Sequence, residues 1–530
     1  MKFLTLLFAL FLTLITLPSS INSLWLPAII DSYMVLQRAP QRAQLWGSSQ
    51  PASIINITWD SDNLYQVFSN DAGYWSLQFP PLQVDGKNHT LMISDNTEIR
   101  SLHSVVIGDV IICSGQSNME LGVNEAFDAD QAIKSSMNYP MIRIFTIEKS
   151  NSTIPLNNTI SRFPSSFDSQ WQISSPSSVN GSYIDTSTTF YGYLSAVCFY
   201  TATKIYDELH GQIPLGLIET AFSGTPIETW SSPDAMSKCD TVNIPLIKKH
   251  KVKKPAPLIP IPRDPSLLWN AMLFPIINFR ISQFLWYQGE SNAGSPNNYA
   301  CRFPVFIEDL REKFQNYQLT FLFVLLAAFQ PHNKGLGWPL TRQAQLTALN
   351  LPYVGVASAI DSGDPASPWT AVHSRYKAVV GERLALQSLK IHYKTLRNNQ
   401  IADGPLVSDI QWPLQTTSKD NANYTATILV RFSSELNINT GLRLNDTREC
   451  DDCCNKGKFS TFTVLTNDGQ THSANSIQIY SESYVIALSV ELSSTSTVIG
   501  LQLMFEDYPQ CSLINSGNIP ALPFKHLRYQ

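Results

Sequence analysis

The alternation of hydrophobic and polar positions divides the chain into three stretches. Between residues 24 and 104, short apolar segments alternate with polar turns, a pattern typical of antiparallel β-structure. It predicts strands at residues 34–37, 43–47, 54–59, 64–68, 73–79 and 89–93. We therefore expect an N-terminal β-domain over residues 24–104, and its sequence contains no cluster of candidate catalytic residues.

From residue 105 to residue 395, apolar runs alternate with helical segments. The runs predict strands at residues 105–112, 141–146, 215–220, 284–288, 320–328 and 354–358, and helices at residues 191–209, 305–317, 340–349 and 376–389. Strands separated by helices predict a parallel sheet with helices on both faces. We therefore expect an α/β domain here, with its catalytic residues on the loops that follow the strands.

The remaining stretch, residues 396–530, loses the helical pattern. Strands are predicted there at residues 423–432, 461–465, 477–480, 484–488 and 498–505, which indicates a second β-rich region. Two insertions interrupt the α/β domain. Residues 146–185 are rich in Ser, Asn and Pro, and residues 238–266 carry a basic run followed by prolines, so both are predicted to be surface loops.

Residues 1–23 have the pattern of a secretory signal peptide: a lysine at position 2, an apolar run and a small-residue exit. A membrane anchor is the alternative. The apolar run of ~15 residues is shorter than the ~20 residues that a bilayer span requires. We therefore predict cleavage and no stable membrane span afterwards.

Cysteines and glycosylation acceptors agree with secretion. Cys450, Cys453, Cys454 and Cys511 are predicted to form disulfides in an oxidising compartment, with the pairing left open. A zinc site at the first three is less favoured, because no histidines follow at finger spacing. Cys113 ends a buried strand and is predicted to be a small core residue. Asn-x-Ser/Thr acceptors occur at Asn56, Asn88, Asn151, Asn157, Asn180, Asn423 and Asn445.

Composition changes this picture little. Hydrophobic residues make up 44% of the 530 positions and charged residues 15%, which is typical of a globular chain with sizeable cores. The formal net charge is −5. Because the chain has neither a strongly basic domain nor a helical arginine face, we do not expect a nucleic acid partner.

The most informative stretch is residues 105–120, where an apolar run ends at Ser114-Gly115 and leads into Gln-Ser117-Asn-Met. A serine on a strand-to-helix turn at the carboxyl edge of a sheet is a common position for a nucleophile. An ordinary turn or helix-cap serine is the alternative interpretation. Three further loops after strands bear on this choice.

Those loops supply the other parts that acyl transfer requires. The second loop contains Gly224, the third contains Gln288 and Asn292, and the fourth ends at His373. A serine hydroxyl becomes a nucleophile when a histidine takes its proton. The oxyanion that forms needs preorganised N–H donors, and the histidine needs a group that fixes its tautomer. The ordered set therefore favours a serine hydrolase.

Five sequence blocks resemble those of the sialate O-acetylesterases, a family within the wider SGNH-hydrolase group of serine esterases. The blocks are Gly115-Gln-Ser117-Asn-Met119, Gly224-Thr-Pro-Ile-Glu228-x-Trp230, Trp286-Tyr-Gln-Gly-Glu-Ser-Asn292, Thr341-Arg-Gln-x-Gln345 and His373-x-x-x-Lys377. The first and third are the most specific. The similarity extends from about residue 30 to the C-terminus and includes both β-rich regions.

This resemblance implies a three-layer α/β/α SGNH-hydrolase-like domain that removes O-acetyl groups from sialic acids through an acetyl-serine intermediate. It implies Ser117 as nucleophile, His373 as base and no metal or organic cofactor. Gly224 and the side-chain amide of Gln288 or Asn292 would complete the oxyanion hole with the N–H of Ser117. The implied partner is an O-acetylated sialic acid or glycoconjugate, in a secreted or lysosomal setting.

Two positions depart from the pattern. The wider group usually carries Asp three residues before the histidine, where this chain has Thr370. Asp361 or Asp364 can fold back to orient the histidine, a backbone carbonyl can serve, or the enzyme can use a Ser–His dyad. The second block has Ser223 where the family often has Gly, which is compatible with a negative φ.

Candidate substrate contacts are Arg342, whose forked cation suits a sugar carboxylate, and Glu290. A structural salt bridge is the alternative for Arg342, and a supporting hydrogen bond is the alternative for Glu290. Trp230, Trp286 and Trp338 can stack on a sugar ring, although core packing is the better interpretation for Trp286. Two other functions remain open: an acetylesterase for another acetylated carbohydrate, and an inactive carbohydrate-binding protein.

Overall fold

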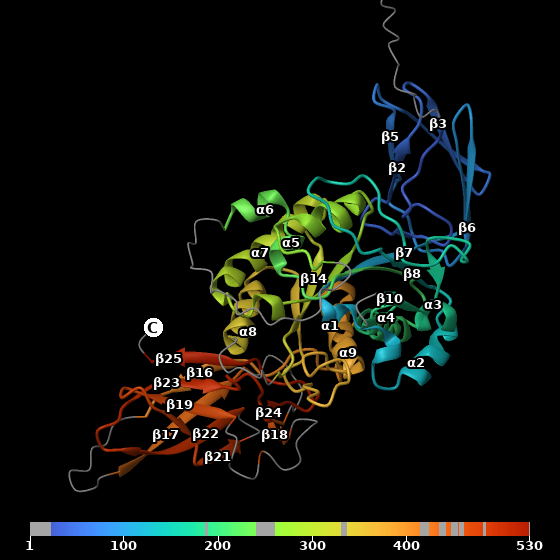
Figure 1. Ribbon diagram of the computed structural model, residues 1–530. Coiled ribbons are helices and arrows are strands. Elements are labelled where there is room, and N and C mark those ends of the chain that lie inside the picture. The colour runs from blue at the N-terminus through green and yellow to red at the C-terminus, as the bar shows by residue number, and fades with distance from the viewer. Residues whose placement is uncertain are drawn as a thin grey trace, which may run out of the picture.

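The computed structural model describes residues 23–185, 189–239, 260–329, 337–413, 423–433, 441–446, 454, 461–480 and 484–528. The predicted signal peptide lies outside these residues, apart from its last position. Most of the predicted insertion at residues 238–266 also lies outside them, as do Cys450 and Cys453. A central α/β domain lies between two β-rich regions (Figure 1).

The centre of the molecule is a parallel sheet with strand order β15-β14-β13-β7-β12-β8, and the short strand β9 pairs antiparallel with β8. The strands are β7 (Ile99–Gly115), β8 (Ile142–Thr146), β9 (Gln172–Ile173), β12 (Leu215–Ala221), β13 (Gln283–Tyr287), β14 (Thr320–Leu325) and β15 (Val354–Ser358). Every residue of β8, β12, β13 and β14 is buried. Their predominantly apolar sequences therefore match a sheet covered on both faces, although β8 buries Arg143 and β12 buries Glu219.

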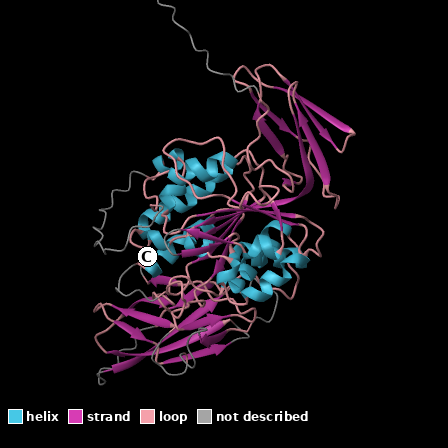
Figure 2. Cartoon of the chain, turned by 45° about the vertical axis from the view of Figure 1, so that its right-hand side comes forward, coloured by secondary structure: helices cyan, strands magenta, loops and turns pink. Residues whose placement is uncertain are grey.

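Helices cover both faces of this sheet (Figure 2). Helices α4 (Ala196–Glu208) and α9 (Lys377–Ser388) pack into the core on one face, and α7 (Pro296–Lys313) packs into the core on the other. The shorter helices are α1 (Ser117–Glu120), α2 (Ala129–Ser135), α3 (Pro176–Asn180), α5 (Ile227–Trp230), α6 (Pro233–Ser237) and α8 (Trp338–Leu346). The predicted α/β/α fold class is confirmed.

The N-terminal β-domain contains β1 (Val35–Gln37), β2 (Gln44–Ser48), β3 (Ile54–Trp59), β4 (Asn63–Phe68), β5 (Tyr74–Gln78) and β6 (His89–Ser94). Strand β7 belongs to this domain and to the central sheet. Its first part pairs antiparallel with β6, and its second part pairs parallel with β12 and β13. The predicted boundary between residues 104 and 105 therefore falls inside one continuous strand.

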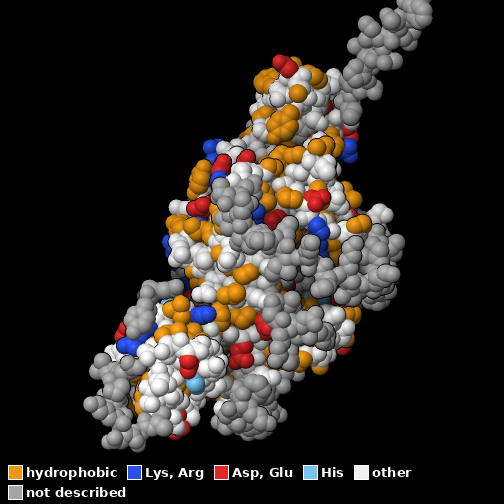
Figure 3. All heavy atoms as spheres, turned by 60° about the vertical axis from the view of Figure 1, so that its left-hand side comes forward, with side chains coloured by type: hydrophobic (Ala, Val, Ile, Leu, Met, Phe, Trp, Pro, Cys, Tyr) orange, Lys and Arg blue, Asp and Glu red, His pale blue; other side chains and the backbone are white. Residues whose placement is uncertain are grey.

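One face of the N-terminal domain exposes apolar side chains. Ile54, Leu64, Phe68, Met92 and Ile99 are between 38% and 69% exposed, and they come from four adjacent strands. Hydrophobic side chains are visible on this domain at the top of Figure 3. These side chains are exposed because every second residue of a strand points away from the core.

The C-terminal region consists of β16 (Val407–Gln411), β17 (Asn423–Phe432), β18 (Arg443–Asp446), β19 (Phe462–Thr466), β20 (Thr471–Ser473), β21 (Ser476–Tyr480), β22 (Val485–Ser493), β23 (Val498–Leu503), β24 (Cys511–Ile514) and β25 (Phe524–Leu527). It has a hydrophobic core of its own. Cys454 forms a disulfide with Cys511, so the predicted disulfide bonding is confirmed for these two residues.

Two further disulfides involve the central domain, and one corrects a prediction. Cys113 is fully buried but is not a free core thiol, because it is bonded to Cys198 of α4. The partner lies 85 residues away, and spacing alone gives no sign of the pairing. Cys239 is bonded to Cys301 of α7. The disulfides among the described residues fit an oxidising compartment.

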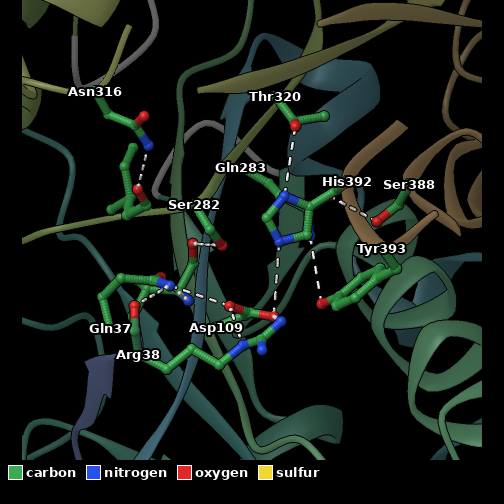
Figure 4. Close-up of polar contacts among 12 residues, drawn as sticks. Gln37, Arg38, Asp109, Ser282, Gln283, Asn316, Thr320, Ser388, His392 and Tyr393 are labelled. Carbon is green, nitrogen blue, oxygen red and sulfur yellow. Dashed lines mark hydrogen bonds and ion pairs between the residues drawn. The ribbon is translucent and has the colours of Figure 1, made fainter. Parts of the chain in front are cut away.

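At the amino end of the central sheet, Asp109 of β7 joins the N-terminal domain to the helical turn Leu389–Tyr393 that follows α9 (Figure 4). Arg38 donates two hydrogen bonds to its carboxylate at 2.9 and 3.0 Å, and Gln37 donates one at 3.0 Å. The ring of His392 lies 3.7 Å away. Burial would raise the pKa of Asp109, but His392 and Arg38 outweigh it and hold that pKa well below its usual range.

We expect Asp109→Ala to lower the free energy of unfolding by about 3 kcal/mol, because the buried donor of Gln37 and the partly buried guanidinium of Arg38 would lose their acceptor. Urea unfolding measures this change. Lys204→Ala is the control, since it removes an exposed ion pair with Glu208 and should cost less than about 1 kcal/mol. Equal losses in the two variants would contradict a special role for Asp109.

Candidate active site

The carboxyl ends of β7, β12 and β13 meet at the point where the strand order reverses, which is the usual ligand position in such sheets. Gly115 ends β7 with a φ of +144°, and a Cβ there would lie 2.2 Å from the carbonyl oxygen of Tyr287. Only glycine fits this turn. It leads directly to Ser117 at the start of α1, which is 7% exposed.

The loop after β12 lies against the same turn. Both the N–H and the hydroxyl of Ser223 donate to Glu120 Oε2 at 2.8 Å. Ser223 has a negative φ, whereas Gly224 has a φ of +72°. Within the described ranges, the backbone N–H groups of Ser117 and Gly224 have no acceptor. Two backbone donors are therefore available beside the serine.

The loop after β13 holds the two candidate side-chain amides. The NH2 group of Gln288 lies 2.7 Å from Asn292 Oδ1, and further acceptors on Thr225 and Gln116 lie at 3.2 and 3.3 Å. Among the residues that the structure describes, the NH2 group of Asn292 has one hydrogen bond, to Glu228 Oε2 at 2.8 Å. An amide NH2 has two hydrogens. Asn292 therefore retains a donor, and Gln288 does not.

The loop after β15, which contains His373, fixes the tautomer of this histidine. Its Nδ1 lies 2.5 Å from the carbonyl oxygen of Trp369, and because a carbonyl only accepts, Nδ1 carries the proton. Nε2 is then free to accept a proton from a nucleophile. Thr370 stands where the wider group has Asp, and its φ of +79° is unusual for a β-branched residue. This backbone conformation points the Trp369 carbonyl at the ring.

Neither predicted carboxylate reaches His373. Asp361 pairs with Arg383 at 2.6 and 2.8 Å, and Asp364 pairs with Arg375 at 2.7 and 2.9 Å. Both are buried against these arginines. The structure therefore corrects the expectation that Asp361 or Asp364 orients the histidine, and the Trp369 carbonyl occupies that position.

Asn118 joins three of the four loops. Its NH2 group donates to the carbonyl of Val372 at 2.9 Å and to Glu290 Oε1 at 2.6 Å, while its oxygen accepts from Lys377 Nζ at 2.6 Å. The residue after the serine is thus bonded to the residue before His373. The described residues contain no hydrogen bond between Ser117 Oγ and His373. In unliganded enzymes such bonds often tighten only with substrate.

Asn118 and Lys377 have no role predicted from the sequence, although both belong to the sequence blocks named above. Their chemistry is visible only when the loops come together, because the hydrogen bonds join residues up to 259 positions apart. Glu290 was predicted as a substrate contact, with a supporting hydrogen bond as the alternative, and it accepts a hydrogen bond from Asn118. Its other oxygen is buried and has no hydrogen-bonding side chain or backbone group beside it in the described part of the chain.

Burial dominates the electrostatics of this network. It lowers the pKa of Lys377 to about 7, despite the opposing charges of Glu290, Glu125 and Asp364. Burial also raises the pKa of Glu290 above its usual value. The pKa of His373 is lowered by burial and further by Lys377, while the Trp369 carbonyl opposes this shift. Burial therefore favours the neutral form of this histidine.

The predicted substrate contact of Arg342 is wrong. The side chain is 0% exposed, and its guanidinium donates to backbone carbonyls on both sides of a domain junction: Leu326, Ala327, Glu506 and Asp507. It connects the central domain to the C-terminal region and cannot reach a sugar. Trp230, Trp286 and Trp338 are likewise buried, so they pack in the core.

The predicted glycosylation acceptors occupy accessible positions. Asn88, Asn151, Asn157, Asn180, Asn423 and Asn445 are exposed, and Asn56 is half-buried. Exposure is a requirement for modification. Glycosylation at these seven positions stays a prediction. In the part of the chain that the structure describes, no helix combines the length and apolar character needed to span a bilayer.

Comparisons with known proteins agree on one family. A family described as "Carbohydrate esterase, sialic acid-specific acetylesterase" matches residues 107–390. Sialate O-acetylesterase from Mus musculus is 28% identical over 93% of both chains, and that from Pongo abelii is 31% identical over 72% of this chain and 73% of the relative.

A solved structure extends the match to the whole fold. A carbohydrate acetylesterase from Xanthomonas citri has a TM-score of 0.74 and 23% identity, covering 96% of this chain and all of the other. At this identity the likeness establishes the fold, including both β-rich regions. The family match and the relative from Pongo abelii show that the chain belongs to the sialic acid-specific acetylesterase family of carbohydrate esterases.

Proposed function

We propose that this protein hydrolyses O-acetyl esters of sialic acids through an acetyl-Ser117 intermediate. The observation that carries the proposal is the hydrogen bond from Asn118 to the Val372 carbonyl, because it holds the serine turn against the histidine loop. The names of the relatives supply the substrate class, and the loops supply the parts that ester hydrolysis requires.

In the first half of the reaction, His373 Nε2 accepts the proton of Ser117 Oγ as that oxygen attacks the acetyl carbonyl. The resulting oxyanion accepts hydrogen bonds from the N–H groups of Ser117 and Gly224, with the remaining donor of Asn292 as the third. The C–O bond to the sugar then breaks. His373 gives the proton to the departing sugar oxygen, which leaves as a hydroxyl, and the acetyl group stays on Ser117.

In the second half, water attacks the acetyl-serine carbonyl and His373 accepts its proton. The same donors stabilise the second oxyanion. When the intermediate collapses, the Ser117 oxygen regains the proton from His373 and acetate leaves. The Trp369 carbonyl keeps Nδ1 protonated throughout, so the dyad runs without a carboxylate.

The pH profile should reflect the burial of His373. We expect the acidic limb of kcat/KM to have a pKa below the ordinary histidine value of about 6.5, because burial disfavours the charged ring. Activity is then lost only as the pH falls through this lowered value. Measuring initial rates of aryl acetate hydrolysis across the acidic range checks it, and a limb above the ordinary value would contradict the assignment.

The substrate test compares purified wild type on 9-O-acetylated sialic acid, acetylated xylan and an aryl acetate. Release of acetate from the sialic acid at a higher kcat/KM than from xylan supports the proposal. Preference for xylan would replace the substrate with another acetylated carbohydrate. Failure on all three would overturn the esterase function and favour a carbohydrate-binding protein.

We also propose that the protein passes through the secretory pathway and is then either secreted or lysosomal. The disulfides and the exposed acceptor asparagines support it. Mass analysis of the protein from its native source, before and after removal of N-linked glycans, tests the prediction. An unchanged mass would contradict passage through a glycosylating compartment.

A further inference from the structure

Three residues after the nucleophile, Glu120 forms a buried charged cluster outside the dyad. Its side chain is 0% exposed, and Lys149 Nζ lies 2.5 Å from Oε1 with a side chain only 1% exposed. Arg162 Nη2 lies 3.8 Å from the same oxygen. Burying charges costs several kcal/mol per ion unless their partners compensate. A cluster this close to the reacting atoms therefore calls for an explanation.

The other oxygen of Glu120 provides it. Oε2 accepts both the N–H and the hydroxyl of Ser223, each at 2.8 Å. Ser223 directly precedes Gly224, whose N–H has no acceptor within the described ranges. Two bonds from one residue to one fixed carboxylate set the orientation of the following peptide group, which carries that N–H.

The geometry points to Glu120 as a positioning residue for the oxyanion hole: held by Lys149, its carboxylate anchors Ser223 and thereby aims the Gly224 N–H at the site of the oxyanion. This inference rests on the proposed function. It also explains why Ser223 occupies a position where related enzymes often have glycine, since only a side chain with a donor can make the second bond.

The segment that supplies the cations was predicted to be a surface loop. Lys149 lies over the ring of Phe222 at 5.2 Å, and Arg162 donates its backbone N–H to Thr146 at the end of β8. Both side chains therefore point inward from residues 146–185. The insertion contributes to the site through Glu120, although it supplies none of the proposed reacting groups.

The test uses Glu120→Gln and Ser223→Ala in the full chain. A glutamine has a single acceptor end, so either Ser223 or Lys149 would face an NH2 donor. We expect Glu120→Gln to lower kcat/KM for an aryl acetate by about 10²-fold, the effect of a small misplacement. Ser223→Ala loses one charge-assisted bond and should lower it by about 10-fold. Ser223→Thr keeps the hydroxyl and should retain activity.

Phenylboronic acid separates positioning from a structural role, because it forms a tetrahedral anion with an activated serine. Its Ki should rise in each variant by the same factor as kcat/KM falls, while KM changes little. Asp109→Asn is the control for a disturbed buried ion pair, with a lower Tm but an unchanged Ki. If Glu120→Gln does not fold, the comparison of Ser223→Ala with Ser223→Thr still tests whether the bond to Glu120 positions the Gly224 N–H.

Two results would overturn the inference: variants that lose only thermal stability while Ki stays unchanged, or variants in which KM rises while kcat stays constant. Failure of the proposed function looks different. In that case the wild type itself neither turns over the ester nor binds the boronic acid, and the variants cannot differ from it.

Discussion

Replacing Ser117 with alanine should lower kcat/KM for acetyl esters by about 10⁶-fold, which is the cost of losing the nucleophile in a serine hydrolase. The fold should be unaffected, since the hydroxyl of Ser117 makes no hydrogen bond among the described residues. Steady-state kinetics on an aryl acetate measures the loss. A burst of product in wild type and no burst in the variant would show the acetyl-enzyme directly.

Ser114→Ala is the matched control. Ser114 lies on β7, directly before the serine turn, is fully buried and has a hydroxyl without a hydrogen-bond partner among the described residues. Removing an unsatisfied buried hydroxyl is neutral or slightly stabilising. This variant should therefore keep its activity. Comparable losses in Ser114→Ala and Ser117→Ala would mean that the strand, and not the nucleophile, had been disturbed.

The second large effect is expected at His373. His373→Ala should lower kcat by about as much as the loss of the serine, because the two residues act as a unit. Asp361→Asn and Asp364→Asn should behave differently. In a true triad, an Asp→Asn change costs about 10⁴-fold in kcat. Here each carboxylate pairs with an arginine, so we expect reduced stability and a nearly unchanged kcat.

Kinetics and thermal unfolding of the three variants check this distinction together. A loss of about 10⁴-fold in kcat for either Asp variant, with an unchanged Tm, would restore that carboxylate as the orienting group. A lower Tm with kcat retained supports the Trp369 carbonyl. The carbonyl itself cannot be removed by substitution, which makes the two carboxylates the informative positions.

Much of the fold could be predicted because the strands are short apolar runs bounded by turn residues. Strands β15 and β17 have the predicted bounds. The residues at which helices begin were harder to predict. Helix α7 begins at Pro296, nine residues before the predicted start, and Pro304 lies inside it, a position that proline usually disfavours. Helix α4 begins after Ser195, whose hydroxyl accepts from the Cys198 N–H.

The candidate site was predictable where chemistry depends on a side-chain type and unpredictable where it depends on the backbone or on distant contacts. The positions of Ser117 and His373 follow from their motifs. The group that orients His373 is a carbonyl, which every residue has, so no sequence signal identifies it. Arg342 shows the opposite error: its residue type suits a carboxylate, but its acceptors include carbonyls 164 and 165 positions away.

Because β7 belongs to two sheets, insertions and deletions within it would affect the serine turn. The strand runs as one element from the outer sheet to the serine turn, with one irregularity in its pairing with β6 near Ser104, so its length sets the position of that turn. Inserting or deleting one residue within it would turn every later side chain to the opposite face. Ser117 would then be misdirected by an event in a domain that holds none of the proposed reacting groups. Length variation is therefore tolerable in the loops on either side, but not along this strand.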